Sequence, residues 1–184
     1  FASTLSAAQA SDFFHQDTLT RYWECARSAL VQHGVTLSGD YVSETAGVLN
    51  GGQSYGIRDA QQIRLGATFD LNRLFSADHA GTIQLTLNDR RGRSTSGDLV
   101  GNRLPVQEVY GGEYTRLSEF SYANLCVTPQ LRYRLGLLAM GNDFGGLSIL
   151  TSCMNAGLCA HALSMSCGSG CGNYPNAHLG GELR

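Results

Sequence analysis

The chain contains no lysine. All 13 of its basic residues are arginine, and its net charge of -2 provides no basic excess of the kind that binds nucleic acid. Proline is rare, with 3 residues, whereas glycine is frequent, with 23, a composition that suits β-strands joined by many turns. No stretch of about 18 consecutive apolar residues occurs, so no transmembrane helix is predicted. At 184 residues, the chain is long enough for one domain.

Sequence motifs for catalysis are also missing. The histidines show neither the spacing of a zinc helix nor that of a catalytic triad, and the glycine pairs at 51–52 and 145–146 lack the Lys-Ser/Thr of a phosphate loop. A C-x-x-C-H haem motif is absent as well. We therefore predict that the chain is not an enzyme and carries no cofactor or metal of its own.

What the sequence does contain is a repeated alternation of apolar and polar residues. Odd positions from Val35 to Tyr41 are mostly apolar, and the same parity returns from Ile63 to Leu71, from Ile83 to Leu87 and from Leu131 to Ala139. A period of two places apolar side chains on one face of a strand and polar ones on the other. The runs of roughly 9–12 residues are close to the ~9–11 that cross a bilayer in a tilted barrel strand.

The remaining segments complete an expected fold. Residues 1–16 form a flexible segment whose Ala8-Gln9-Ala10 is similar to the end of a secretory signal peptide. Residues 17–184 form one domain, which begins with a helix over 17–33 that Gly34 terminates. Residues 114–125 are an expected strand with ambiguous faces, and a short last strand begins near Asn176. The fold class is mainly β, an antiparallel up-and-down meander of about six long strands in which short turns alternate with long loops, as in a partial porin-like barrel.

Several short motifs, in this order, resemble the carbohydrate-selective porin (OprB) family over about residues 22–184. They are Tyr41 to Val48 with Gly51-Gly52, Asp70-Leu71, Asn88 to Arg93, Gln107 to Gly112, Gly141 to Phe144, Cys153 to Cys159, and Tyr174-Pro175. The chain departs from the family in having His178-Leu179-Gly180 where Trp-Gly is usual. The resemblance implies that charges on the polar face line a sugar channel: Glu44, Arg64, Arg90, Glu119, Arg132 and Arg134. A solvated face with ion pairs is the alternative.

The six cysteines are expected to form disulfides in an oxidising compartment. Cys25 and Cys126 both fall on the turn side of the barrel topology, and a bridge between them could contribute up to ~4–5 kcal/mol in the chain-entropy model. Cys153 with Cys159, a pair that the resemblance supports, and Cys167 with Cys171 would staple the long loop, although the connectivity within this loop stays open. Zinc held by these four cysteines and His161 is the alternative.

Six strands are too few to close a membrane barrel, which needs about eight, and unpaired strand edges are not tolerated in lipid. The small number of strands therefore predicts that the chain forms no pore alone and that a partner protein covers its open edges. With its 19.7 kDa mass, it is similar to the small third subunit of the membrane-bound quinohaemoprotein alcohol dehydrogenase. The first hypothesis is therefore a non-catalytic periplasmic subunit that supports assembly of that complex, with PQQ and haem c on the large and cytochrome subunits. The alternative is the N-terminal part of an outer-membrane sugar porin, with sugars and outer-membrane lipid as partners.

Overall fold

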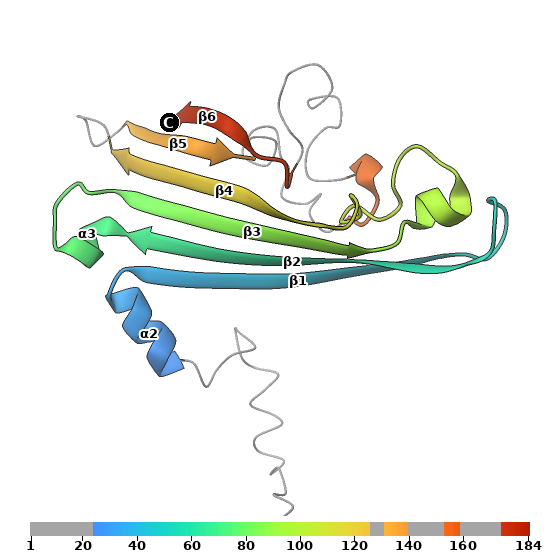
Figure 1. Cartoon of the computed structure of the whole chain (residues 1–184), viewed down its shortest axis with the longest axis horizontal. Coiled ribbons are helices and arrows are strands. Elements are labelled where there is room, and N and C mark those ends of the chain that lie inside the picture. The colour runs from blue at the N-terminus through green and yellow to red at the C-terminus, as the bar shows by residue number, and fades with distance from the viewer. Residues whose placement is uncertain (1–23, 126–130, 140–152, 159–173) are drawn as a thin grey trace, which may run out of the picture.

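The computed structural model describes residues 24–125, 131–139, 153–158 and 174–184. These residues form one open antiparallel sheet in the order β1-β2-β3-β4-β5-β6, so every strand pairs with its neighbours in sequence (Figure 1). The strands are β1 (Val35–Val48), β2 (Gly56–Asp70), β3 (Thr82–Gly92), β4 (Tyr114–Leu125), β5 (Arg132–Leu138) and β6 (His178–Leu183). The predicted mainly β fold with six antiparallel strands is confirmed.

Within the described residues, four short helices accompany the sheet: α2 (Glu24–Gln32), α3 (Leu71–Phe75), the π-helix η2 (Ser96–Val100) and the 3-10 helix η4 (Ala156–Leu158). The predicted helix over 17–33 is observed from Glu24 onward, and its earlier residues lie outside the described part of the chain. Gly34 ends α2 in the left-handed region at φ +86, where an added Cβ would lie 2.7 Å from the Asp70 carbonyl oxygen. Glycine is therefore required where the helix meets the sheet.

One short helix was not expected from the alternation. Leu71 was predicted to continue the second strand, but it begins α3, because the Asp70 carboxylate accepts hydrogen bonds from the amides of Asn72 (3.0 Å) and Arg73 (3.4 Å). An aspartate in this capping position satisfies free helix donors and so ends the strand. The helix in turn ends at Ser76, which has φ +51.

A β-bulge in β4 explains the ambiguous faces of residues 114–125. Leu85 pairs with Phe120 and Leu87 with Leu117, so the two partners in β4 are three residues apart while those in β3 are two apart. The additional residue is Ser118, which is buried and whose hydroxyl donates to the Thr86 carbonyl oxygen at 3.2 Å. The bulge shifts the parity within β4 and returns Leu117 and Phe120 to the same apolar face.

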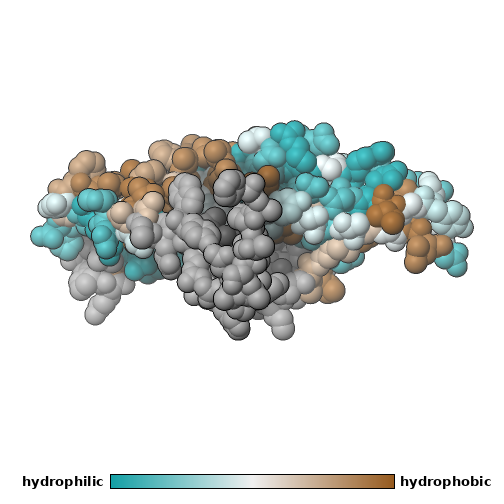
Figure 2. All heavy atoms as spheres, turned by 90° about the horizontal axis from the view of Figure 1, so that it is seen from below, coloured by the Kyte–Doolittle hydropathy of each residue, from teal (hydrophilic) through white to brown (hydrophobic). Residues whose placement is uncertain are grey.

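Each strand presents one apolar and one polar face, as the alternation predicts. We call the outer face the one that carries the odd-numbered residues of β1 to β3, and the polar face the opposite one. Side chains of the outer face are well exposed in this chain, among them Leu37 at 45%, Tyr41 at 59%, Leu65 at 57% and Phe120 at 53%. Brown residues gather toward the end of the sheet that carries α3, and teal residues gather toward the other end (Figure 2).

Few apolar side chains are buried within the described residues: Val48, Ala60, Leu99, Val109, Leu138, Ala156 and Pro175. Buried polar residues are more numerous in the same part of the chain, and they include Asn88, Arg90 and Gln107. The sheet therefore does not fold around an apolar core of its own, and its apolar surface faces outward. Within the described segments, no helix is both long enough and apolar enough to cross a membrane.

Candidate functional site

The candidate site is the polar face of the sheet. The strand register sets Asp40 opposite Arg64, Arg64 opposite Asn88, and Thr86 opposite Glu119. By the same register, all six predicted charges fall on this face: Glu44, Arg64, Arg90, Glu119, Arg132 and Arg134. The structure thus places them on one surface, while their role in lining a pore stays a prediction.

The first ion pair of this face joins β1 and β2. Arg64 Nε donates to Asp40 Oδ1 at 2.6 Å, and both side chains are partly exposed, at 44% and 38%. Exposed pairs of this kind contribute only about 0–1 kcal/mol to stability. The pair therefore matters less for holding the strands than for presenting a fixed donor beside a fixed acceptor.

A second cluster of charges links β4, β5 and β6. Arg134 contacts Glu119 at 3.3 Å and Glu182 at 2.8 Å, and the Glu182 side chain is only 5% exposed. Arg184 also pairs with Glu182. Because Glu182 is enclosed, removing Arg134 would leave a buried carboxylate short of a partner, which is far more costly than breaking a surface pair.

Arg132 is the first residue of β5, two positions before Arg134 on the same face. It is exposed, at the border of a cavity of about 380 Å³ that Asp78 and His79 also line. This cavity lies at the α3 end of the sheet, beside the β2–β3 turn.

Arg90 is buried at 4% exposure, unlike the paired arginines. Its Nε donates to Gln62 Oε1 at 2.9 Å, and its guanidinium carbon lies 5.8 Å from the centre of the Tyr174 ring. Arg64 lies 6.0 Å from the same ring, so Tyr174 lies within cation–π distance of both arginines.

A pocket of about 310 Å³ opens on the polar face beside these groups. It is lined by Ser38, Gly39, Asp40, Arg64, Gln84, Thr86, Ser118, Glu119, Ala139 and Tyr174. Hydroxyl, amide, carboxylate and guanidinium groups thus surround one aromatic ring. Such a lining can exchange hydrogen bonds with a small solute rich in hydroxyl groups.

The connection between β3 and β4, residues 93–113, packs against the far end of this face. The Gln107 side chain is 1% exposed and donates to the carbonyl oxygens of Glu44 (2.5 Å) and Arg58 (3.1 Å), while it accepts from the Thr95 amide at 2.8 Å. The Val109 amide donates to Glu44 Oε2 at 3.0 Å. We call residues 93–113 the docked loop, because these bonds fasten it to β1 and β2.

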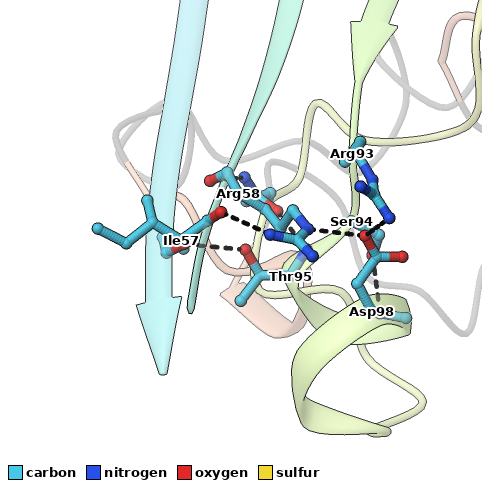
Figure 3. A network of polar contacts seen from close by, with 9 residues as sticks. Ile57, Arg58, Arg93, Ser94, Thr95 and Asp98 are labelled. Carbon is cyan, nitrogen blue, oxygen red and sulfur yellow. Dashed lines mark hydrogen bonds and ion pairs between the residues drawn. The ribbon is translucent and has the colours of Figure 1, made fainter. Parts of the chain in front are cut away.

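An ionic contact also holds the docked loop. Asp98 Oδ2 lies 2.8 Å from Arg58 Nε and 2.7 Å from an Arg93 nitrogen, and Figure 3 shows both arginines converging on this carboxylate. The hydrogen bond from Arg58 and the nearby charge of Arg93 lower the pKa of Asp98 below its ordinary value. The carboxylate therefore stays charged at neutral pH and in mild acid.

Sequence reasoning missed several residues of this face. Asp40 and Glu182 share the parity of the predicted charges and could have been found by extending the alternation to every carboxylate. Gln107 and Tyr174 entered only as parts of family motifs. Their contacts join segments far apart in the sequence, 63 positions in the case of Gln107 and Glu44, so no local pattern reveals them.

The cysteine predictions fall largely outside the described residues. Cys126, Cys159, Cys167, Cys171 and His161 are not described, and for Cys25 only the backbone position in α2 is. Cys153 forms no disulfide within the described part of the chain. No cluster of three or more potential metal ligands occurs among the described residues. The disulfide pairing, and zinc as its alternative, stay predictions.

Comparison with known proteins identifies relatives along most of the chain. Porin B of Pseudomonas aeruginosa is 28% identical over 180 residues, which cover 92% of this chain and 39% of that protein. The high-pH structure of Pseudomonas putida OprB superimposes with a TM-score of 0.77 at 26% identity, covering 88% of this chain and 40% of the other. The low-pH structure of the same porin superimposes with a TM-score of 0.54, covering 71% of this chain and 42% of the other. The chain spans about two fifths of the length of these relatives.

These matches overturn the first functional hypothesis. The accessory-subunit role in an alcohol dehydrogenase was inferred from chain length and open strand edges, without any motif, and it is wrong, because the relatives that cover most of the chain are porins. The periplasmic complex loses its support with it. Its dehydrogenase subunits, with PQQ and haem c, were expected only under that hypothesis. The prediction that the chain is not an enzyme is confirmed by the same matches.

A family model confirms the resemblance seen in the motifs. It matches residues 54–184, which is more than half of the chain and includes β2 to β6. The chain belongs to the carbohydrate-selective porin, OprB family.

Proposed function

We propose that this chain forms the N-terminal part of an outer-membrane porin through which sugars diffuse. The observation that carries the proposal is the sheet with two unlike faces, one apolar and exposed, the other polar with ion pairs and a docked loop. A transmembrane barrel has the same arrangement, an apolar exterior and a polar interior. The family membership supports the same function.

The outer face supports contact with lipid. From Val35 to Tyr41, β1 makes six residue steps, roughly 20 Å along the strand at about 3.4 Å per residue. At the ~35–45° tilt of barrel strands this is roughly 15 Å of the ~25 Å height of the apolar band. Beyond Tyr41 the same face becomes polar, and the hydroxyls of Ser43 and Thr45 each donate to Asp59 at 2.7 Å. The strands therefore extend past the lipid into water at one end.

The open edges of the sheet support a longer protein. β1 and β6 are the outermost strands of the described sheet, and each pairs on one side only. A barrel must close in lipid and has about eight strands or more. In the proposed porin, the strands that close the barrel come from the rest of a protein as long as its relatives.

The polar face supports a neutral, hydroxyl-rich solute. Arg64 is paired with Asp40 and Arg134 with Glu119, so donors and acceptors lie side by side while their charges largely cancel. Sugar hydroxyls both donate and accept hydrogen bonds, and they can bridge such pairs without bringing a charge into the channel.

The test uses the full-length protein, purified from outer membranes and reconstituted in liposomes. Swelling in glucose faster than in protein-free vesicles, and recovery of the protein in the outer-membrane fraction, would support the proposal. The double variant Asp40→Asn with Arg64→Gln should slow sugar entry, whereas the outer-face variant Gln61→Asn, as a matched control, should not. A folded, inserted protein that passes small ions but no sugar would refute the proposal.

A further inference from the structure

The cavity of about 380 Å³ at the α3 end of the sheet is separate from the pocket beside Tyr174. Arg132 at the start of β5, and Asp78 and His79 of the β2–β3 turn, line it together with polar side chains of α3, β3 and β4. The two spaces share no lining residue. The cavity at the α3 end is therefore a place of its own on the molecule, with its own set of charged groups.

Two opposite charges line this cavity without pairing with each other. Within the described part of the chain, the Arg132 side chain contacts no carboxylate and donates no hydrogen bond, and the Asp78 carboxylate contacts no cation. On the polar face, by contrast, Arg64 is paired with Asp40 at 2.6 Å. A guanidinium and a carboxylate that both keep their hydrogen-bonding capacity can together hold a molecule that carries both opposite charges.

The turn that carries Asp78 and His79 is fixed in place. His79 has a φ of +60, and its carbonyl oxygen accepts a hydrogen bond from Asn124 Nδ2 of β4 at 2.6 Å. The Ala80 amide donates to Asn72 Oδ1 of α3, also at 2.6 Å. The turn is thus bonded to both α3 and β4, which holds the backbone that carries Asp78 at one rim of the cavity.

Arg132 is fixed at the opposite rim. Its amide donates to the Arg184 carbonyl oxygen at 2.7 Å, and its carbonyl oxygen accepts from the Arg184 amide at 2.8 Å. These two bonds hold the first residue of β5 to the end of β6, so that a ligand has only the side chain of Arg132 to order. Because the backbone of both rims is already held, less binding free energy is lost on association than at a mobile site.

We propose that this cavity binds a small zwitterion of the amino-acid class, with Arg132 binding its carboxylate and Asp78 binding its ammonium group. The planar guanidinium offers several donors to a carboxylate, and the aspartate offers acceptors to an ammonium group. A molecule with one charge binds more weakly, because it pairs with one of these side chains and meets the other as a like charge. The site goes beyond the proposed passage of sugars and does not depend on it.

The experiment measures binding to the full-length protein in detergent micelles by equilibrium dialysis, which requires no transport. Glycine, β-alanine and 4-aminobutyrate, whose two charges lie progressively further apart, are compared with butyrate and butylamine, which carry one charge each. At least one of the zwitterions should bind about tenfold more tightly than both single-charge analogues. Arg132→Gln should abolish the preference over butylamine, and Asp78→Asn the preference over butyrate. Arg27→Gln, the matched control, replaces an exposed arginine of α2 that does not line the cavity, and it should leave both preferences unchanged.

Equal binding of the zwitterions and their single-charge analogues by the wild type would overturn the inference, and so would an equal loss in Arg27→Gln and Arg132→Gln. If Arg132→Gln does not fold, Asp78→Asn decides alone, and an undiminished preference over butyrate in that variant refutes the site. Liposome swelling tests the proposed function separately. A protein that passes glucose without preferring zwitterions keeps the porin function and loses only this site, whereas one that binds zwitterions but passes no sugar keeps the site alone.

Discussion

Replacing Gln107 with alanine should release the docked loop from the sheet. The side chain makes three hydrogen bonds, two to carbonyl oxygens of β1 and β2 and one from the Thr95 amide, and it is 1% exposed. A hydrogen bond of this kind contributes about 0.5–1.5 kcal/mol net, and a buried group left unpaired costs about 1–3 kcal/mol. Water entering the vacated space recovers part of this cost. We expect local opening of the loop to become easier by about 2–3 kcal/mol.

Amide hydrogen exchange of the reconstituted protein measures this change directly. At about 1.4 kcal/mol per factor of ten, the Thr95 and Val109 amides should exchange roughly 30- to 150-fold faster in Gln107→Ala. Gln61→Ala is the matched control, because Gln61 is an exposed glutamine of β2 that donates to Asp59 on the outer face and does not contact the loop. Exchange at these two amides that is the same in both variants would refute the assignment of Gln107 as the anchor.

Three further predictions follow from the structure. Because Arg58 lowers the pKa of Asp98, the ionic contribution to loop docking is complete above the ordinary aspartate pKa and is lost as the pH falls through the lowered value. Proteolysis of the loop should therefore increase more in strong acid in the wild type than in Asp98→Asn, which retains the carboxylate contact of Glu44 with the Val109 amide. Equal acid sensitivity of the two proteins would contradict this. Leu65→Arg on the apolar outer face should lower the stability of the barrel in lipid by about 2–4 kcal/mol, as measured by equilibrium refolding into vesicles. Thr45→Arg, beyond the apolar band, should change this stability little, and equal effects of the two variants would argue against a lipid-facing surface. Gly136→Ala should destabilise the sheet by about 1–3 kcal/mol in thermal unfolding, because the new Cβ would lie 2.2 Å from the Phe120 carbonyl oxygen at a φ of +144, while Gly97→Ala meets nothing closer than 3.5 Å and should be neutral.

The sequence predicted the strands well, because a period of two is a local signal. The parity of Ile63, Leu65 and Phe69 alone places them on the outer face, and the register confirms it. Where an element depended on a single capping contact, as at Asp70 before α3, the alternation misassigned Leu71. Chain length was the weakest basis for inference, since it led to a dehydrogenase subunit that the porin relatives contradict.

The candidate site was predicted in part. The alternation identified the charges of the polar face, because side chains at every second position of a strand point to the same face of the sheet. It could not identify Tyr174 or Gln107, whose importance comes from contacts between distant segments. Nor could it show that Arg90 is buried while Arg132 is exposed, since burial depends on which loop covers which strand.

The added residue Ser118 has a consequence for how β4 tolerates changes in length. Since Arg116 and Glu119 share a face although they are three positions apart, deleting Ser118 would leave every other side chain of the strand on its present side. Deleting Ser121 instead would invert the sides of all residues on one side of the gap, moving apolar groups to the polar face or charges to the outer face. Within β4, loss of Ser118 would therefore keep every remaining side chain on its present face, whereas loss of Ser121, three residues later, would not.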